Sequence, residues 1–173
     1  MSAQPQVQVH HSPEIARSYP PAAYAFLLEG LNFAVEKIHG PMSEPAETVA
    51  KYMVAESLDL QELWERREAG ALAPEVCQAI EDAGGIERLN RHVSGQDLCW
   101  ALRDWAVARW GFLAPVVLGT WNVTRTIDLG NLVFDLIEHG RLQKEPQDHI
   151  DDFRNVFDFQ DAFDRAYRVE FSG

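Results

Sequence analysis

Apolar residues recur at three- and four-residue steps along most of this chain, which is the pattern of helices that bury one face. The first such stretch follows Pro20-Pro21, which suit a first helical turn, and ends at Gly40-Pro41, which stop a helix. Its apolar positions are Tyr24, Leu27, Leu28, Leu31, Ala34, Val35 and Ile38. We predict a core helix of about 18 residues here.

Residues 41–90 keep the helical period but are acidic, with eleven Asp and Glu side chains against four Lys and Arg. Ser43 is a suitable start for a first helix, Pro74 opens another, and Gly84-Gly85 ends it. We predict two or three short helices that cover partly one another and partly the main core. Their many carboxylates are typical of a solvated face.

The segment RHVSGQDL, residues 91–98, has the spacing of a helix N-terminus. In that interpretation the Ser94 hydroxyl accepts the Asp97 backbone N–H, and the Asp97 carboxylate accepts the Ser94 N–H, as in a capping box. His92 and Ser94 also suggest a His–Ser nucleophile, but that role needs a third, orienting group that the sequence does not show. We therefore predict that Ser94 and Asp97 form a structural cap.

Further helices are predicted after this cap, over residues 95–110, 112–121 and 126–139, the last with Thr126 as its cap. RLQKE (141–145) and DFRNVFDF (152–159) are interpreted as two short strands joined by a turn. A last amphipathic turn or short helix covers 159–167. The order of helices and strands resembles that of a winged helix, and this likeness of topology carries no function with it.

The predicted fold class is therefore mainly α, with a small C-terminal two-stranded β element in winged-helix-like order. The length favours a single helical domain, which we place at residues 14–173. Residues 41–90 are an acidic helical insertion in that domain. Residues 1–13 are polar and Gln-rich, and we interpret them as a flexible tail.

Composition narrows the class of protein. An apolar fraction of 46% fits a globular chain, and no run approaches the roughly 18 apolar residues of a membrane span. The N-terminus lacks the basic and apolar regions of a signal peptide. Cys77 and Cys99 lie in helical patterns, with neither metal nor disulfide spacing. We expect a cytoplasmic protein.

The charge distribution argues against binding to nucleic acid. The formal net charge is −12, and the helix that would contact DNA in a winged helix carries Asp128, Asp135 and Glu138 without any Lys or Arg. The expected wing is acidic too. A surface that binds phosphates has to replace their counterions with basic side chains. A winged shape in this chain would therefore bind protein.

Candidate chemistry is sparse. Asp148, His149, Asp151 and Asp152 are the only cluster of hard-metal ligand types. They lack the spacing of an EF-hand or an H-x-x-x-H pair, so we interpret them as a solvated acidic loop and expect no metal. P-loop, G-x-G-x-x-G, G-x-S-x-G and H-E-x-x-H motifs are absent from the sequence. We predict no catalytic residue and no cofactor.

Tryptophans offer candidate binding residues. Most of them belong to the apolar middle of the chain and are expected in the core. Trp100 and Trp110 lie off the main apolar stripe of their helix, and tryptophan is enriched at interface hot spots. We predict that these two residues anchor a partner.

Several stretches together resemble a small uncharacterised bacterial family. They are RHVSGQDL, WAVARWG, VVLGTWNVTRTIDLGNLVFDLIEHGRLQK and DDFRNVFDFQDAF, along with the first helix. Members of that family carry a H-V-S-G-Q-[ED]-L helix start and a later T-x-D-F-G-E-I-V-F-N-L-V-E helix. Here Asn122 stands in place of Gly, Leu129 in place of Phe and Asn131 in place of Glu. The family has no established activity, cofactor or partner, so the resemblance implies no catalytic residue.

These observations favour a cytoplasmic protein-interaction module or adaptor without catalysis. Its surface would combine an apolar patch with an acidic rim, so its protein partner is expected to carry a basic patch. One alternative is a nucleic-acid-binding regulator that uses basic residues of the near-neutral middle of the chain; these are Arg91, Arg103, Arg109 and Arg125. Another alternative is a metal-dependent enzyme that uses the acids of residues 148–152.

Overall fold

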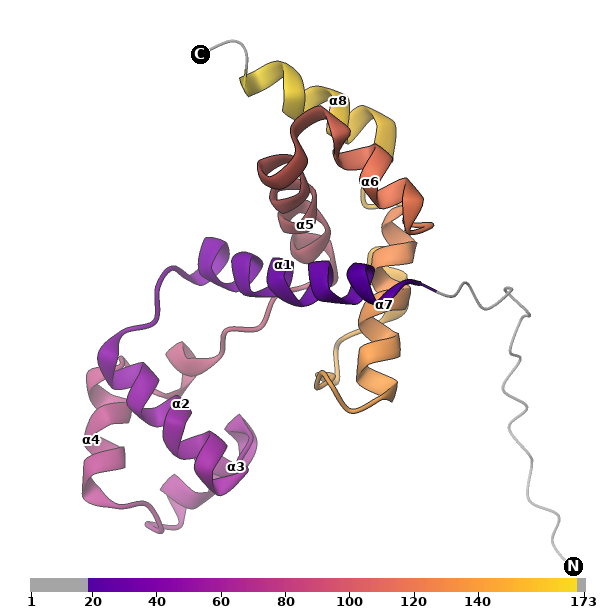
Figure 1. Ribbon diagram of the computed structural model, residues 1–173. Helices are drawn as coiled ribbons and strands as arrows, with labels where there is room; N and C mark the ends of the chain where they lie inside the picture. Colours follow the sequence, from indigo (N-terminus) through magenta and orange to yellow (C-terminus); the bar gives the residue numbers. More distant parts are fainter. Residues whose placement is uncertain (1–18, 171–173) are drawn as a thin grey trace, which may run out of the picture.

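The computed structural model describes residues 19–170, which are helices, turns and loops without a β-strand (Figure 1). In chain order the elements are α1 (Pro21–His39), α2 (Glu44–Glu56), α3 (Leu60–Glu68), α4 (Pro74–Asp82), η1 (Ile86–Leu89), α5 (Gly95–Trp110), η2 (Gly111–Leu113), α6 (Ala114–Thr120), α7 (Thr126–Glu138), η3 (Ile150–Phe153) and α8 (Phe159–Glu170), where η marks a 3-10 helix. None of the described helices is both long and apolar enough to cross a membrane. The predicted tail, residues 1–13, lies outside the described residues.

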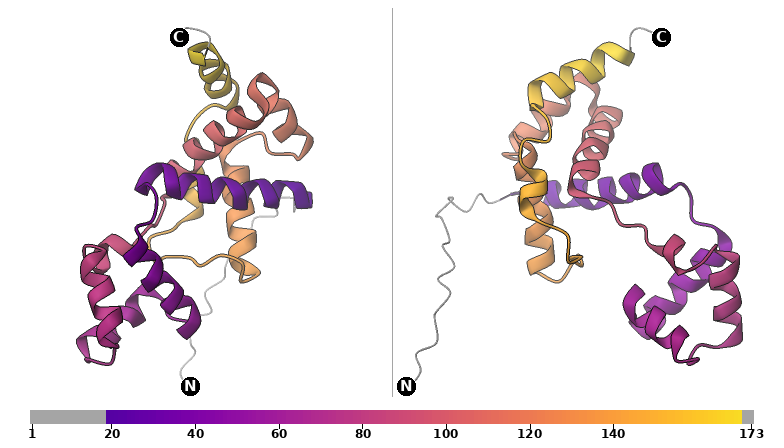
Figure 2. Two further views of the ribbon diagram at one scale, coloured as in Figure 1. Left: turned by 60° about the vertical axis from the view of Figure 1, so that its left-hand side comes forward. Right: turned by 180° about the vertical axis from the view of Figure 1, so that it is seen from behind.

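The main body consists of α1 together with residues 91–170. In it α1 packs across α5 and α7, and α8 lies over α5 and α6 (Figures 1 and 2). Its core is the apolar stripe that the sequence predicts, with Leu27 of α1, Leu102 of α5 and Leu132 of α7 almost fully buried. Gly30 allows the close approach of α1 and α5, because a Cβ there would lie 2.3 Å from a Leu102 methyl group.

The acidic lobe, residues 41–90, has a hydrophobic core of its own. Val49 of α2, Leu63 of α3 and Ile80 of α4 are fully buried together. We expected this segment to cover part of the main core, but its buried residues form a cluster separate from that core. All views show the lobe projecting from the main body, joined at the end of α1 and before α5 (Figure 2).

The predicted two-stranded β element, and with it the wing, is wrong. Residues 141–149 form loops and turns, 150–153 form η3, and α8 begins at Phe159. Aspartate side chains take the backbone donors that a strand would have paired: Asp148 accepts from the Glu145 N–H and Asp152 from the His149 N–H, both at 2.9 Å. Aspartates favour such local bonds over sheet pairing.

Phe153 determines where this C-terminal segment lies. Its side chain is buried between the helices α5 and α7, against Gly95 and Gly130. A Cβ on Gly130 would lie 2.7 Å from Phe153 Cβ, and a Cβ on Gly95 would lie 2.8 Å from the Phe153 ring. The apolar periodicity of the segment therefore reflects one buried aromatic ring and its neighbours, not an alternating strand.

The start of α7 is organised by a buried carboxylate. The cap residue is Arg125 rather than the predicted Thr126, and Thr126 is the first helical residue. Asp128 is fully buried, and its Oδ2 accepts the backbone N–H groups of Thr124 at 3.0 Å and Arg125 at 2.9 Å. Just before this turn, Asn122 has φ of 61°, a left-handed conformation that Asn and Gly adopt more readily than other residues.

Polar contacts also join α1, and Tyr19 just before it, to α7. The Tyr19 hydroxyl donates to Asp128 Oδ1 at 3.4 Å and accepts from the Asn131 amide at 3.2 Å. The Tyr24 hydroxyl donates to Asp135 at 2.9 Å. Burial, followed by this contact with Asp135, raises the pKa of Tyr24 to about 12. These bonds fix the axial position of α1 along α7.

Candidate functional site: a cleft between the main body and the acidic lobe

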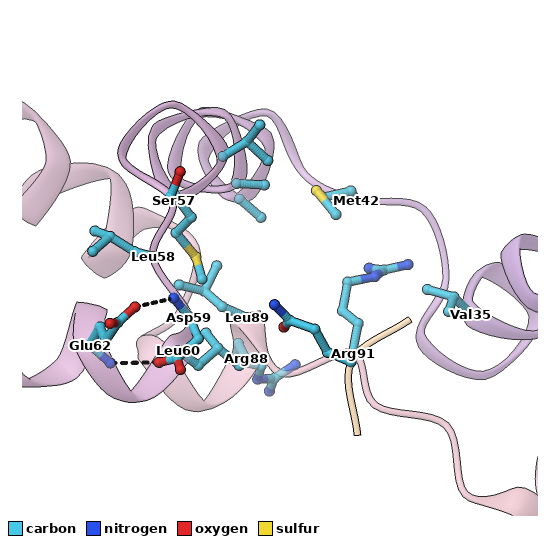
Figure 3. Close-up of a pocket in the computed structure, with 15 residues that line it drawn as sticks. Val35, Met42, Ser57, Leu58, Asp59, Leu60, Glu62, Arg88, Leu89 and Arg91 are labelled. Carbon is cyan, nitrogen blue, oxygen red and sulfur yellow. Dashed lines mark hydrogen bonds between the residues drawn. The ribbon is translucent and has the colours of Figure 1, made fainter. Parts of the chain in front are cut away.

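A cleft of about 690 Å³ lies where the acidic lobe meets the main body (Figure 3). We call it the interlobe cleft. Its lining residues are Val35, Met42, Ala46, Ala50, Met53, Val54, Ser57, Leu58, Asp59, Leu60, Glu62, Arg88, Leu89, Arg91 and Gln143. The size and the mostly apolar lining are those of ligand and partner sites in proteins.

One wall of the cleft is a face of α2 that the lobe core leaves uncovered. Val49 points into that core and is fully buried, whereas Val54, five residues later, is 80% exposed. Ala46, Ala50 and Val54 recur every four residues, so they form one ridge along the helix. Exposure of a ridge of this kind leaves apolar surface that a partner can cover.

The opposite side of the cleft carries charge. Arg88 comes from η1 and Arg91 from the linker that enters α5; Figure 3 shows Arg91 between Arg88 and Val35. Within the described residues, the Arg88 guanidinium makes no hydrogen bond or ion pair. Arg91 donates through one terminal nitrogen to the Gly40 carbonyl, while its buried Nε has no partner in this part of the chain.

The two acids of the cleft are held by their own backbone. Asp59 accepts the Glu62 N–H at 2.8 Å, and Glu62 accepts the Asp59 N–H at 2.9 Å, which is the capping box of α3 (Figure 3). Their side chains therefore have fixed positions at the end of the cleft away from Val35. The lining is thus apolar in the middle, basic on one side and acidic at one end.

A smaller cavity of about 220 Å³ adjoins the cleft and shares Arg91 with it. His92 lies on its wall, with Nε2 3.1 Å from Asp148 Oδ1 and Nδ1 3.6 Å from Glu145 Oε1. These contacts tie the loop after α7 to the chain before α5. Both ring nitrogens of His92 thus face carboxylates, and neither is hydrogen-bonded to Ser94.

Ser94 lies in a cap. Its hydroxyl accepts the Asp97 N–H at 3.1 Å and donates to the Asp97 carboxylate at 2.7 Å. The carboxylate thus contacts the Ser94 hydroxyl, where the sequence pattern predicts the Ser94 N–H. The hydroxyl has its proton and a lone pair engaged within α5, so this geometry does not support the His–Ser nucleophile.

The two candidate tryptophans lie in different settings. Trp100 is 41% exposed, and its ring packs 4.6 Å from that of Phe157 and under the Arg103 guanidinium. Trp110 is half-buried against the rings of Phe26 and Trp121. Neither lines the interlobe cleft. Trp100 and Phe157 together attach the C-terminal segment to α5.

The acids of residues 148–152 do not converge on a common point. Asp148 contacts His92, Asp151 pairs with Arg154, and Asp152 caps the turn at His149. No group of three or more potential metal ligands occurs in the described part of the chain. The structure therefore gives no support to a cation site there.

The arginines of the nucleic-acid alternative are similarly dispersed and engaged. Arg103 donates to the Ala162 carbonyl, Arg109 pairs with Glu29, and Arg125 lies 3.6 Å from Asp128. Each holds a different contact within the main body. They do not present one basic surface.

No family model, curated protein or solved structure matches this chain. The candidate site consequently depends on its own geometry. Sequence reasoning missed Met42, Val54 and Arg88, although a signal for Val54 is present. The stretch TVAKYMV has apolar residues on more than one side of the helix, and the lobe core includes Val49, Tyr52 and Met53 of this stretch but not Val54.

Proposed function

We propose that this protein is a cytoplasmic protein-interaction module without catalysis, and that it binds its partner in the interlobe cleft. The observation that carries the proposal is the apolar α2 wall facing Arg88 and Arg91 across a space of about 690 Å³. The free thiols of Cys77 and Cys99 fit a reducing compartment.

The composition of the cleft supports a protein partner. Met42 and Val54 are both exposed, and they border the cleft from the connection and from α2. Interfaces combine such an apolar centre with arginine side chains and a polar rim. The acidic lobe supplies a rim with a surplus of seven negative charges, so we propose a partner with a basic patch around its apolar contact.

A matched pair of variants tests the proposal. Val54→Glu places a charge on the cleft wall, and Val116→Glu places the same charge on α6, where Val116 is 61% exposed and outside the cleft. Both side chains are exposed, so neither change should unfold the protein. The tagged wild type and both variants are used to capture proteins from a native lysate with and without nuclease, and retained proteins are identified by mass spectrometry.

The proposal predicts a protein that is retained by the wild type and by Val116→Glu but is lost with Val54→Glu. Circular dichroism of each variant checks that the helices are intact. Equal retention by both variants would refute the cleft as the binding surface. A wild type whose partners are all lost on nuclease treatment would instead support the nucleic-acid alternative.

A further inference from the structure

Two arginines, Arg88 and Arg91, line the interlobe cleft and make few contacts within the described residues. Arg88 has no hydrogen bond or ion pair within the described residues, and the Arg91 Nε is buried without a partner there. Arg88 is exposed and Arg91 is half-buried, and both line the cleft beside its apolar wall. Arginine in such a place is suited to a planar carboxylate, which it binds through two parallel N–H bonds.

We infer, on the basis of the proposed function, that the partner segment is an amphipathic helix whose apolar face carries one carboxylate side chain. That carboxylate pairs with Arg88 and Arg91, and the neighbouring apolar side chains pack on α2. The observation that carries this inference is that one cleft holds both arginines and the α2 ridge, which is exposed at Val54 and half-buried at Ala46 and Ala50.

A helix fits the shape of the apolar wall. Ala46, Ala50 and Val54 form a ridge at four-residue steps with small side chains at two of its three positions. Ridges of this kind pack into the grooves of a second helix. A helix that lies in an apolar groove presents residues at i, i+3, i+4 and i+7, so one position of that stripe lies opposite the arginines.

The charges that line the cleft differ from those of the acidic rim around it. Asp59 and Glu62 lie at one end of the cleft and are held by the α3 capping box. A partner helix therefore meets positive charge along one side of the cleft and negative charge at one end. The basic patch proposed for the partner lies outside the contact face, while its carboxylate lies within that face.

The test uses three model peptides, each of about 16 residues, acetylated, amidated and labelled with fluorescein. They share a leucine stripe with helical spacing and differ at one central position of that stripe, which is Glu, Gln or Lys. Binding to the full chain is measured by fluorescence anisotropy at low and high salt. The proteins compared are the wild type, Arg88→Gln, and a control, Arg165→Gln, on exposed α8 far from the cleft.

We expect the Glu peptide to bind the wild type and Arg165→Gln about fivefold or more tightly than the Gln peptide, and the Lys peptide to bind most weakly. Arg88→Gln should remove most of the preference for Glu and leave the affinity for the Gln peptide unchanged. Salt should reduce the preference. Equal binding of the three peptides, preference for Lys, or binding of none would overturn the inference.

The inference and the proposed function fail separately. A protein captured in a Val54-dependent manner, together with peptides that show no preference for Glu, would overturn the carboxylate and keep the cleft as an interaction site. Capture that is unaffected by Val54→Glu would overturn the proposed function whatever the peptides show.

Discussion

Replacing Asp128 by alanine tests the reasoning about the main body most severely. The Asp128 carboxylate is fully buried and accepts two backbone N–H groups, those of Thr124 and Arg125, at 3.0 and 2.9 Å. It also accepts the Tyr19 hydroxyl at 3.4 Å. Alanine removes the acceptor and leaves both backbone donors without it, which costs about 1–3 kcal/mol for each group that stays dry. We expect the free energy of unfolding to fall by about 3–4 kcal/mol in total.

Urea unfolding followed by tryptophan fluorescence measures this change. The matched control is Asp164→Ala, because Asp164 lies exposed on α8. The control should shift the unfolding free energy by less than about 0.5 kcal/mol. Asp128→Asn keeps one acceptor oxygen and should fall between the two. If Asp128→Ala were no more destabilising than the control, the carboxylate would not organise the start of α7.

Three further predictions concern packing inside the protein. Burial raises the pKa of the Cys99 thiol to about 12 from an ordinary 9.0, so a thiol reagent at neutral pH should label Cys77 quickly and Cys99 only on unfolding, as peptide mapping would show. The pKa of Cys99 is higher in the folded than in the unfolded state, so its contribution to stability should be fully present below pH 9 and lost as the pH rises towards 12. Urea titrations at alkaline pH should show a smaller loss of stability for Cys99→Ala than for the wild type. Gly130→Ala places a Cβ 2.7 Å from Phe153 and should lower the unfolding free energy by about 1–2 kcal/mol, whereas Gly119→Ala, with open space at the Cβ, should raise it by about 0.5–1 kcal/mol. Equal effects of the two glycine changes in urea titrations would contradict the close approach of Phe153.

The helices of the main body were predictable because local signals agree with the packing. Pro20-Pro21 and Gly40 delimit α1, and the apolar stripe between them becomes its buried face. The absence of the wing was not predictable from the sequence. Its residues have strand-like composition, but the burial of Phe153 and the local hydrogen bonds of Asp148 and Asp152 determine their backbone conformation. The contacts of Phe153 with Gly95 and Gly130 join residues far apart in the chain, which periodicity does not report.

The candidate site was less accessible to sequence reasoning than the fold. An acidic, Glu-rich segment predicts a solvated face, and the acidic lobe does have one, yet it also leaves Val54 exposed in the cleft that Arg88 lines. The cleft exists because the lobe closes its own core around Val49 and Leu63 instead of covering the main body. Trp100, chosen from the sequence as an anchor, packs against Phe157, remains partly exposed and lies outside the cleft.

The most direct test of the central claim is hydrogen exchange of the protein, measured alone and with the partner whose capture depends on Val54. Mass spectrometry reports the change in amide protection along the chain. We predict increased protection on α2 and across η1 to Arg91, the segments that border the interlobe cleft. Protection confined to α5 and α8 around Trp100, with none on α2, would contradict the proposed cleft and place the binding site around Trp100.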